Sequence, residues 1–172
     1  MPEVERQGSW WRGGLFLIFA AFVVALDQIS KLWVSSHFEP YETIPLIGPL
    51  SLTNVRNTGS AFGLFANQTF LLILVAIVGL VTILLFYRYF SRSNILGISA
   101  LGLVFGGAVG NLIDRIRFGY VTDFIDVRLW RDFHWPAFNV ADSAITVGTI
   151  MLVIFIFLAF RKGDGSSSRA RS

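Results

Sequence analysis

Four apolar runs, each long enough to cross a membrane as a helix, divide the chain. A membrane-spanning helix needs about 20 consecutive apolar residues, and the runs cover about residues 13–34, 69–87, 94–113 and 143–160. The polar segments between them are too short to hold a second domain. The pattern predicts a mainly α membrane protein in which residues 1–172 form a single integral membrane domain with four transmembrane helices.

The first apolar run has two interpretations. Arg12 followed by about a dozen apolar residues is also typical of a cleaved signal peptide. No small-x-small cleavage site follows directly, however, and the helical pattern continues through Asp27 and Lys31. These two residues have the i, i+4 spacing, acid first, that suits a helical pair. We therefore interpret the run as a retained first transmembrane helix.

Two longer polar segments, residues 35–67 and 114–142, separate the spans. Within the first, TIPLIGPLSLTNV alternates partly and carries Pro45 and Pro49, which favours short edge strands. The motif NVRNTGSAFGLFAN follows, where glycine permits a tight backbone and Asn57 is suited to capping a turn.

The third span and the C-terminal tail differ in composition from the rest of the chain. Gly102, Gly106 and Gly110 recur every fourth residue, and this small-xxx-small spacing lets a neighbouring helix approach closely. The tail, residues 161–172, is basic and rich in serine, so we expect it to be disordered.

The composition supports a polytopic membrane protein. Hydrophobic residues make up 54% of the chain and charged residues only 15%, against roughly a quarter charged in soluble domains. The absence of cysteine excludes disulfides, thiolate metal sites and a cysteine nucleophile. The formal net charge of +3 does not indicate nucleic-acid binding, because basic residues in membrane proteins usually reflect topology and anionic lipid.

An even number of spans places both termini on one side of the membrane. The positive-inside rule makes that side cytoplasmic, since it would hold Arg6, Arg12, Arg88, Arg92, Arg161, Lys162, Arg169 and Arg171. The segments 35–67 and 114–142 then become outer loops.

The segment from Asn111 to Ser143 carries the candidate chemistry. It contains five aspartates, namely Asp114, Asp123, Asp126, Asp132 and Asp142. Asp123 and Asp142 stand in mostly apolar or uncharged surroundings, which is costly at a membrane edge and suggests a function. Two close carboxylates that share a proton can activate water for hydrolysis. Asp142 would begin a helix, whose positive end favours the ionised form, and Asp123 would be the protonated partner.

Structural interpretations of the same acids stay open on the residues alone. Asp142 is a good N-cap for the fourth helix, and Asp123 could sit in a turn or pair with Arg117 or Arg128. Asp114 beside Arg115 resembles an interfacial ion pair.

The remaining charged residues also have simple structural interpretations. Asp126 and Asp132 are expected to be solvated, and His134 is expected to be an interface residue among aromatics. Asp27 and Lys31 would form a structural pair or a lid on the floor of the site.

Other functional classes fit less well. The histidines, His37 and His134, do not form H-E-x-x-H, and Ser60 is not in G-x-S-x-G. A proton-coupled transporter would be expected to show midplane charges and repeated halves. A non-catalytic assembly factor would depend on the glycine face and not on Asp123 and Asp142.

Five sequence blocks, in order, resemble the bacterial lipoprotein signal peptidases (signal peptidase II). They are DQISK at 27–31, NTGSAFG at 57–63, GGAVGNLIDRI at 106–116, GYVTDFID at 119–126 and FNVADSAI at 138–145. The resemblance covers roughly residues 15–160, and several ordered blocks are more specific than any single motif. Ser60 departs from the family, which more often has alanine there.

The resemblance assigns roles to nine residues. Asp123 and Asp142 would be the catalytic pair. Asn111 and Arg115 would hold the substrate backbone, Asn139 would be a further polar residue of the site, and Asn57 and Gly59 would frame the pocket. Asp27 and Lys31 match the first-helix block and would support the site.

The resemblance also implies a reaction and a location. Such an enzyme is an intramembrane aspartic endopeptidase of the bacterial inner membrane, with its site near the periplasmic face. It removes the signal peptide of a diacylglyceryl-modified prolipoprotein by cleaving before the lipidated cysteine. We expect no metal or cofactor, contact with membrane lipids, a monomeric enzyme, and a small extracytoplasmic β platform in residues 35–67.

Overall fold

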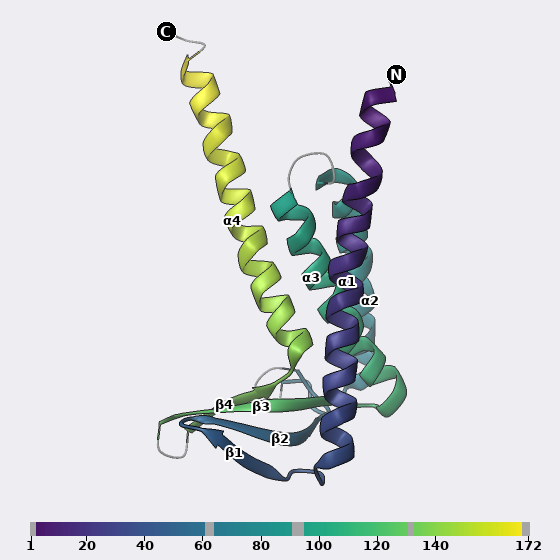
Figure 1. Ribbon diagram of the computed structural model, residues 1–172, viewed down its shortest axis with the longest axis vertical. Helices are drawn as coiled ribbons and strands as arrows, with labels where there is room; N and C mark the ends of the chain where they lie inside the picture. Colours follow the sequence, from purple (N-terminus) through teal and green to yellow (C-terminus); the bar gives the residue numbers. More distant parts are fainter. Residues whose placement is uncertain (1–2, 61–63, 91–94, 131–132, 170–172) are drawn as a thin grey trace.

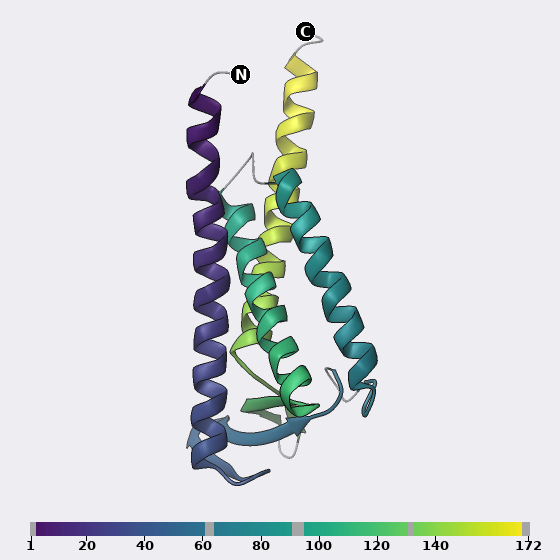
Figure 2. The same cartoon turned by 90° about the vertical axis from the view of Figure 1, so that its right-hand side faces the viewer.

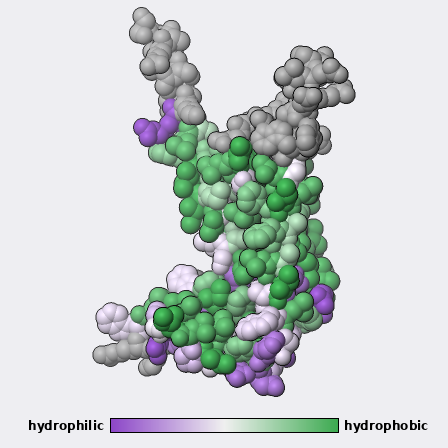
Figure 3. Space-filling model, in the orientation of Figure 1, coloured by the Kyte–Doolittle hydropathy of each residue, from purple (hydrophilic) through white to green (hydrophobic). Residues whose placement is uncertain are grey.

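Long helices dominate the computed structural model, which describes residues 3–60, 64–90, 95–130 and 133–169. Within these ranges the helices are α1 (Glu3–His37), α2 (Thr69–Phe90), α3 (Ile95–Phe118) and α4 (Val140–Arg169). Each contains a segment long and apolar enough to cross a membrane, which confirms the predicted fold class. Figure 3 shows mostly apolar residues over the helices. Many of the polar residues lie at the lower end of the molecule in this view.

Helix α3 is central because its small residues admit both α1 and α4. A Cβ atom at Gly106 would lie 2.7 Å from the carbonyl oxygen of Ala20 on α1, and one at Gly102 would lie 2.9 Å from the carbonyl oxygen of Phe16. On another side of α3, a Cβ atom at Gly107 would collide with the carbonyl oxygen of Ala141 on α4. The predicted glycine face is therefore confirmed as a helix-packing surface.

Helix α2 packs against this core along part of its length. Near its C-terminal end, Ile83 and Tyr87 pack on a cluster formed by Phe16, Ile98 and Leu101. Towards Thr69 the helix diverges from α3 (Figure 2). There Thr69 Oγ1 donates a hydrogen bond to the carbonyl oxygen of Gly119, the residue that follows α3, at 2.7 Å.

A four-stranded antiparallel sheet lies across that same end of the helices (Figure 1). Its strands are β1 (Thr43–Ile47), β2 (Leu50–Asn57), β3 (Val121–Trp130) and β4 (Phe133–Phe138), in the order β1-β2-β3-β4. Helix α1 begins and α4 ends at the opposite end of the molecule.

The sheet draws on both polar segments, whereas the prediction placed the β platform in residues 35–67 alone. β3 and β4 come from the second segment. Their pattern was hard to recognise because polar Asp123 and Asp126 occupy buried positions of β3 and break the expected apolar alternation. The sheet is fixed to the end of α1 by a cluster of Val34, Phe38 and Phe124.

The expectation of a disordered tail from residue 161 also differs from the structure. Helix α4 continues to Arg169. No proline follows Val140, so nothing removes a donor from the backbone ladder, and the two glycines at 163 and 165 weaken a helix without ending it.

Replacing Gly106 with alanine should destabilise the protein, because the added methyl group meets backbone atoms of α1 that cannot move separately. We expect a loss of about 1–3 kcal/mol, measured as a lowered midpoint of thermal unfolding in detergent. Gly79→Ala on α2 is the matched control, since a Cβ atom there meets nothing within 4 Å. Equal midpoints for the two variants would show that α1 and α3 do not pack as described.

Candidate active site

A cavity of about 1020 Å³ opens where α2 diverges, between the helices and the sheet. Its apolar walls come from α2 (Leu72, Val75), α4 (Ile145, Val147) and β4, where Phe138 contributes. Polar groups also line the cavity, and six of them were predicted to belong to the site. They are Asn57, Gly59, Asn111, Arg115, Asp123 and Asp142. The cavity thus brings together six of the seven residues predicted to be catalytic or substrate-binding.

Asp123 reaches the cavity from β3 and is almost completely buried. Its side chain accepts hydrogen bonds from Asn57 Nδ2 at 2.8 Å and from Asn139 Nδ2 at 2.7 Å. Burial raises the pKa of the Asp123 carboxyl to about 7, with a further contribution from the negative charge of Asp142. A carboxyl group in this state can hold a proton near neutral pH and give it up during a reaction.

Asp142 lies in the first turn of α4, where it completes a capping box with Asn139. The backbone N–H of Asp142 donates to Asn139 Oδ1 at 2.9 Å, and the backbone N–H of Asn139 donates to Asp142 Oδ2 at 3.2 Å. Asp142 Oδ1 accepts a hydrogen bond from Asn111 Nδ2 at 2.8 Å. The N-cap is therefore Asn139, three residues before the aspartate that could have been taken for it, and the Asp142 carboxylate both closes the cap and faces the cavity.

Asn139 connects the two acids without lining the cavity itself. Its side chain is completely buried. The Nδ2 atom donates to Asp123 while the Oδ1 atom accepts from the backbone of Asp142. The side-chain amide therefore ties β3 to the start of α4.

Arg115 and Gly59 contact each other in the lining of the same cavity. Arg115 Nη2 donates to the carbonyl oxygen of Gly59 at 3.2 Å, and the Gly59 N–H donates to Asn57 Oδ1 at 2.9 Å. A Cβ atom at Gly59 would lie 2.8 Å from the carbonyl oxygen of Leu64, so the loop requires glycine there. This chain of contacts places a guanidinium group beside the two carboxylates.

Asp27 and Lys31 lie behind the site, buried in the helix bundle. Lys31 forms ion pairs with Asp27 at 2.8 Å and with Asp114 at 3.2 Å. Asp27 Oδ1 also accepts the backbone N–H of Ala141 at 2.9 Å, so an α1 carboxylate caps the start of α4. Asp27 and Lys31 thus contact α4 and Asn111 from α1, and neither residue lines the cavity.

Asp114 and Gln28 belong to this buried group and were not recognised in the sequence. Asp114 accepts hydrogen bonds from Gln28 Nε2 at 2.9 Å and from the backbone N–H of Thr122 at 3.1 Å. Its ion-pair partner is Lys31, so the expected interfacial pair of Asp114 with Arg115 is wrong. The sequence does contain an indication of this group. Polar residues spaced three or four apart lie on one face of a helix, and both α1 and α3 carry such residues, so the two polar faces can meet.

Asp126 is buried, not solvated as expected. Both of its carboxylate oxygens lie 2.9 Å from His134 Nδ1 on β4. His134 therefore joins the two strands, although the sequence suggested only an interface residue. Asp132 lies outside the described residues.

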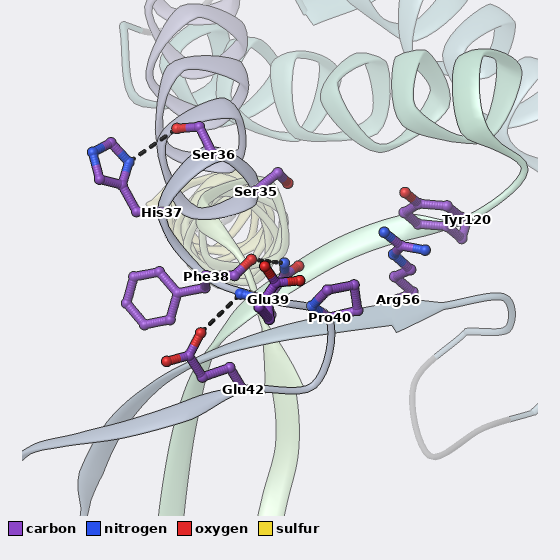
Figure 4. Close-up of a pocket in the computed structure, with 10 residues that line it drawn as sticks. Ser35, Ser36, His37, Phe38, Glu39, Pro40, Glu42, Arg56 and Tyr120 are labelled. Atoms are coloured by element: carbon purple, nitrogen blue, oxygen red, sulfur yellow. Dashed lines mark hydrogen bonds between the residues drawn. The ribbon is translucent and has the colours of Figure 1, made fainter.

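A second cavity, of about 370 Å³, lies beside the C-terminal end of α1 and is also lined by residues of β2. Figure 4 shows Arg56 and Tyr120 on one side of it and Ser36 and His37 on the other. The Arg56 guanidinium lies 5.3 Å from the centre of the Tyr120 ring. Neither candidate catalytic aspartate lines this cavity, so we place the candidate site in the larger one.

The fold and the site together define a multi-pass membrane enzyme with a polar site at one end of a helix bundle. A sequence model of the family described as signal peptidase (SPase) II matches residues 19–158. The chain belongs to this family, so it is a peptidase that removes signal peptides from lipoproteins. The transporter and assembly-factor alternatives are thereby wrong.

Individual relatives agree with this assignment. The lipoprotein signal peptidase of Moorella thermoacetica is 47% identical over 138 residues, which cover 80% of this chain and 89% of that protein. The enzyme of Syntrophotalea carbinolica is 45% identical, with 81% and 89% covered. A bacterial membrane enzyme structure solved at 2.3 Å by the in meso method superposes with a TM-score of 0.75 at 31% identity. That alignment covers 84% of this chain and 88% of the other.

Replacing Asn139 with alanine should destabilise the protein, because the cap of α4 and a donor to Asp123 are both lost. We expect a loss of about 1–3 kcal/mol, read from thermal unfolding in detergent. Ser143→Ala is the control from the same turn, since it removes only a hydroxyl that donates to the carbonyl oxygen of Asn139. If both variants unfolded at the wild-type temperature, Asn139 would not hold β3 and α4 together.

Proposed function

We propose that the protein is an intramembrane aspartic endopeptidase that cleaves diacylglyceryl-modified prolipoproteins before the lipidated cysteine. The observation that carries the proposal is that Asp123 and Asp142, from different elements, line one cavity in different environments. Asp123 is buried and its pKa is raised to about 7. Asp142 is half-buried and accepts two hydrogen bonds. Such a difference suits one carboxyl to the role of acid and the other to that of base.

In the proposed reaction, a water molecule binds between the two carboxyl groups. Asp142 takes a proton from this water as its oxygen attacks the carbonyl carbon of the scissile peptide bond. Asp123 gives its proton to the carbonyl oxygen, and a tetrahedral intermediate forms. Collapse of the intermediate breaks the C–N bond, and the proton held by Asp142 passes to the leaving nitrogen of the cysteine. A hydroxyl proton of the intermediate returns to Asp123 as the carboxyl product forms, which restores both acids to their starting states. No covalent intermediate is needed.

The substrate backbone would be held by the polar groups next to the acids. The Arg115 guanidinium is fixed by the carbonyl oxygen of Gly59 and has further N–H groups to donate to peptide carbonyls. Asn57 keeps the neighbouring loop in place through both of its amide atoms. Asn111 presents its amide to Asp142 and so supports the base.

The apolar walls suit the rest of such a substrate. Signal helix and acyl chains are already in the bilayer, and the cavity is lined by apolar residues of α2 and α4, whose helices are long enough to span it. We infer that the signal helix enters between α2 and α4 from the lipid, with its C-terminal end at the aspartates.

The sheet end of the bundle would face the periplasm and the termini the cytoplasm of a bacterial inner membrane. The excess of arginine and lysine in the segments at the other end supports this orientation. Contact with membrane lipids follows from the exposed apolar helix surfaces. We propose that one copy of the chain is active, because the polar groups of the site all come from it.

Replacing either Asp123 or Asp142 with asparagine should reduce cleavage by at least about 10²–10⁴-fold, since asparagine can neither accept nor deliver the proton. The assay uses purified protein in detergent with a diacylglyceryl-modified prolipoprotein, and product is identified by mass. Asp126→Asn on β3 is the matched control, because it makes the same change in charge outside the cavity and should leave the rate within about threefold.

A folded Asp142→Asn or Asp123→Asn protein with wild-type turnover would overturn the assignment of the two acids. Wild-type protein that leaves several lipidated substrates intact would overturn the proposed reaction.

The rate of cleavage should fall as the pH rises through about 7. The pKa of Asp123 is raised to about 7, so the proton that this group must deliver is present below that pH and lost above it. The measurement is kcat against pH with saturating lipidated substrate. The same shift affects stability. In the unfolded chain the Asp123 carboxyl has its ordinary pKa of 3.8, so its protonation stabilises the folded state at low pH. This contribution is lost as the pH rises through about 7. A kcat that does not change through this range would contradict the role of Asp123 as the acid.

A further inference from the structure

The Lys31 ammonium group is fixed by three acceptors. An ammonium group has three N–H donors and no acceptor. The Nζ atom of Lys31 lies 2.8 Å from Asp27 Oδ2, 3.2 Å from Asp114 Oδ2 and 3.0 Å from Asn111 Oδ1. Two of these partners are carboxylates and the third is a neutral amide. Since Lys31 is buried, its position is determined by these three contacts.

The contact with Lys31 decides which way the Asn111 amide points. The two ends of an amide are distinguished by their hydrogen-bond partners, and an ammonium group can face only an oxygen. If the amide were turned around, its NH₂ group would point at the buried ammonium and its oxygen at the Asp142 carboxylate. Both contacts would then be repulsive. With Lys31 in place, the Asn111 NH₂ group must face Asp142, to which it donates at 2.8 Å.

The Asn111 oxygen also helps to orient Asn139. Asn139 Nδ2 lies 3.2 Å from Asn111 Oδ1 and 2.7 Å from Asp123 Oδ1. Asn139 Oδ1 accepts the backbone N–H of Asp142. The Asn111 oxygen, which is held by Lys31, thus contacts the Asn139 side chain that donates to Asp123. The nitrogen of the same Asn111 amide donates to Asp142.

We propose that Lys31 is a positioning residue for the two-carboxylate site, acting through the orientation of Asn111. Lys31 does not line the cavity, so it does not touch a substrate there. The inference rests on the proposed function, which it deepens by assigning a task to a buried charge on α1.

The charge of Lys31 also acts on the site at a distance. Its positive charge lowers the pKa of Asp123, which opposes the larger effect of burial. The charged groups around Lys31 and the two acids are Asp27 on α1, Asp114 and Arg115 on α3, Asp123 on β3 and Asp142 on α4. Removing the ammonium should therefore raise the pKa of Asp123, which a loss of packing alone would not do.

The test compares two variants that differ only at residue 31. Asp114→Asn is the reference, and Lys31→Met with Asp114→Asn is the test protein. Removing Asp114 together with Lys31 keeps the net charge of the buried group as in the wild type, so that no additional uncompensated carboxylate is left. We expect kcat of the double variant to be about 10–100-fold below that of Asp114→Asn. KM should stay within about threefold because the cavity walls are unchanged.

The pH profile and a conservative variant separate orientation from charge. In the double variant, the fall of kcat at alkaline pH should occur at higher pH than in Asp114→Asn. Lys31→Gln in the same background restores a donor to Asn111 without the charge. It should recover about 2–10-fold of kcat over methionine, while the alkaline fall stays at the higher pH.

Equal kcat values and equal pH profiles for the folded double variant and Asp114→Asn would overturn the proposal. If the double variant does not fold, an NMR measurement on the wild-type protein tests the orientation of Asn111 instead. There the ¹⁵N-labelled Asn111 NH₂ signals, assigned by their loss in Asn111→Asp, should move as the site carboxylates titrate. Signals that do not respond would show that the amide faces elsewhere. This measurement needs no cleavage, so a wild-type enzyme that fails to cleave lipidated substrates would count against the proposed function alone.

Discussion

The structure depends on satisfying a group of polar side chains that are buried at one end of an apolar helix bundle. An unpaired polar or charged group in such surroundings would cost several kcal/mol, and in lipid no water is present to replace a missing partner. Among the described residues, no buried side-chain nitrogen or oxygen lacks a hydrogen-bond partner. Asn139 is the central member, because both of its amide atoms are used and they reach different acids. The same contacts therefore hold the two acids in place, and the hydrogen bonds from Asn57 and Asn139 oppose the rise that burial causes in the pKa of Asp123.

The glycines of α3 make this arrangement possible. Gly106 brings α1 close, and a Cβ atom at Gly110 would lie 2.6 Å from Asp27 Oδ2. A larger residue at either place would push α1 away and separate Lys31 from Asn111. Packing and chemistry are thus coupled. Because glycine has no Cβ atom, α1 and α3 can approach closely, and this brings their charged side chains within hydrogen-bond distance. The apolar half of α3 holds the bundle together, and its polar half holds the site.

Much of the architecture was predictable from sequence, because long apolar runs and glycine spacing are local signals. Four spans and the glycine face needed no knowledge of distant contacts. β3 was not predictable in the same way, since Asp123 and Asp126 occupy positions where alternation calls for apolar residues. They are tolerated there because Asn139, Asn57 and His134 reach them from elsewhere in the chain.

The candidate site residues followed from ordered sequence blocks, but their partners did not. Asp114 adjoins Arg115 in the sequence, and only the fold shows that it pairs with Lys31 on a different helix. Asp142 alone fits a helix cap, and the structure shows that cap and cavity use the same carboxylate. A single sequence can mark an acid in an apolar setting as unusual. It cannot say which distant amide makes the setting acceptable.

The two acids differ because they are attached to different kinds of backbone. Asp123 projects from a strand whose neighbours cover it, so burial dominates and its pKa rises to about 7. Asp142 belongs to the first turn of a helix, where the backbone N–H of Asn139 donates to its Oδ2 atom. A symmetric pair of aspartates would need the substrate to break the symmetry. In this protein the strand and the helix terminus already give the two acids different surroundings. Under the proposed mechanism, the division into acid and base would therefore be built into the fold before any substrate binds.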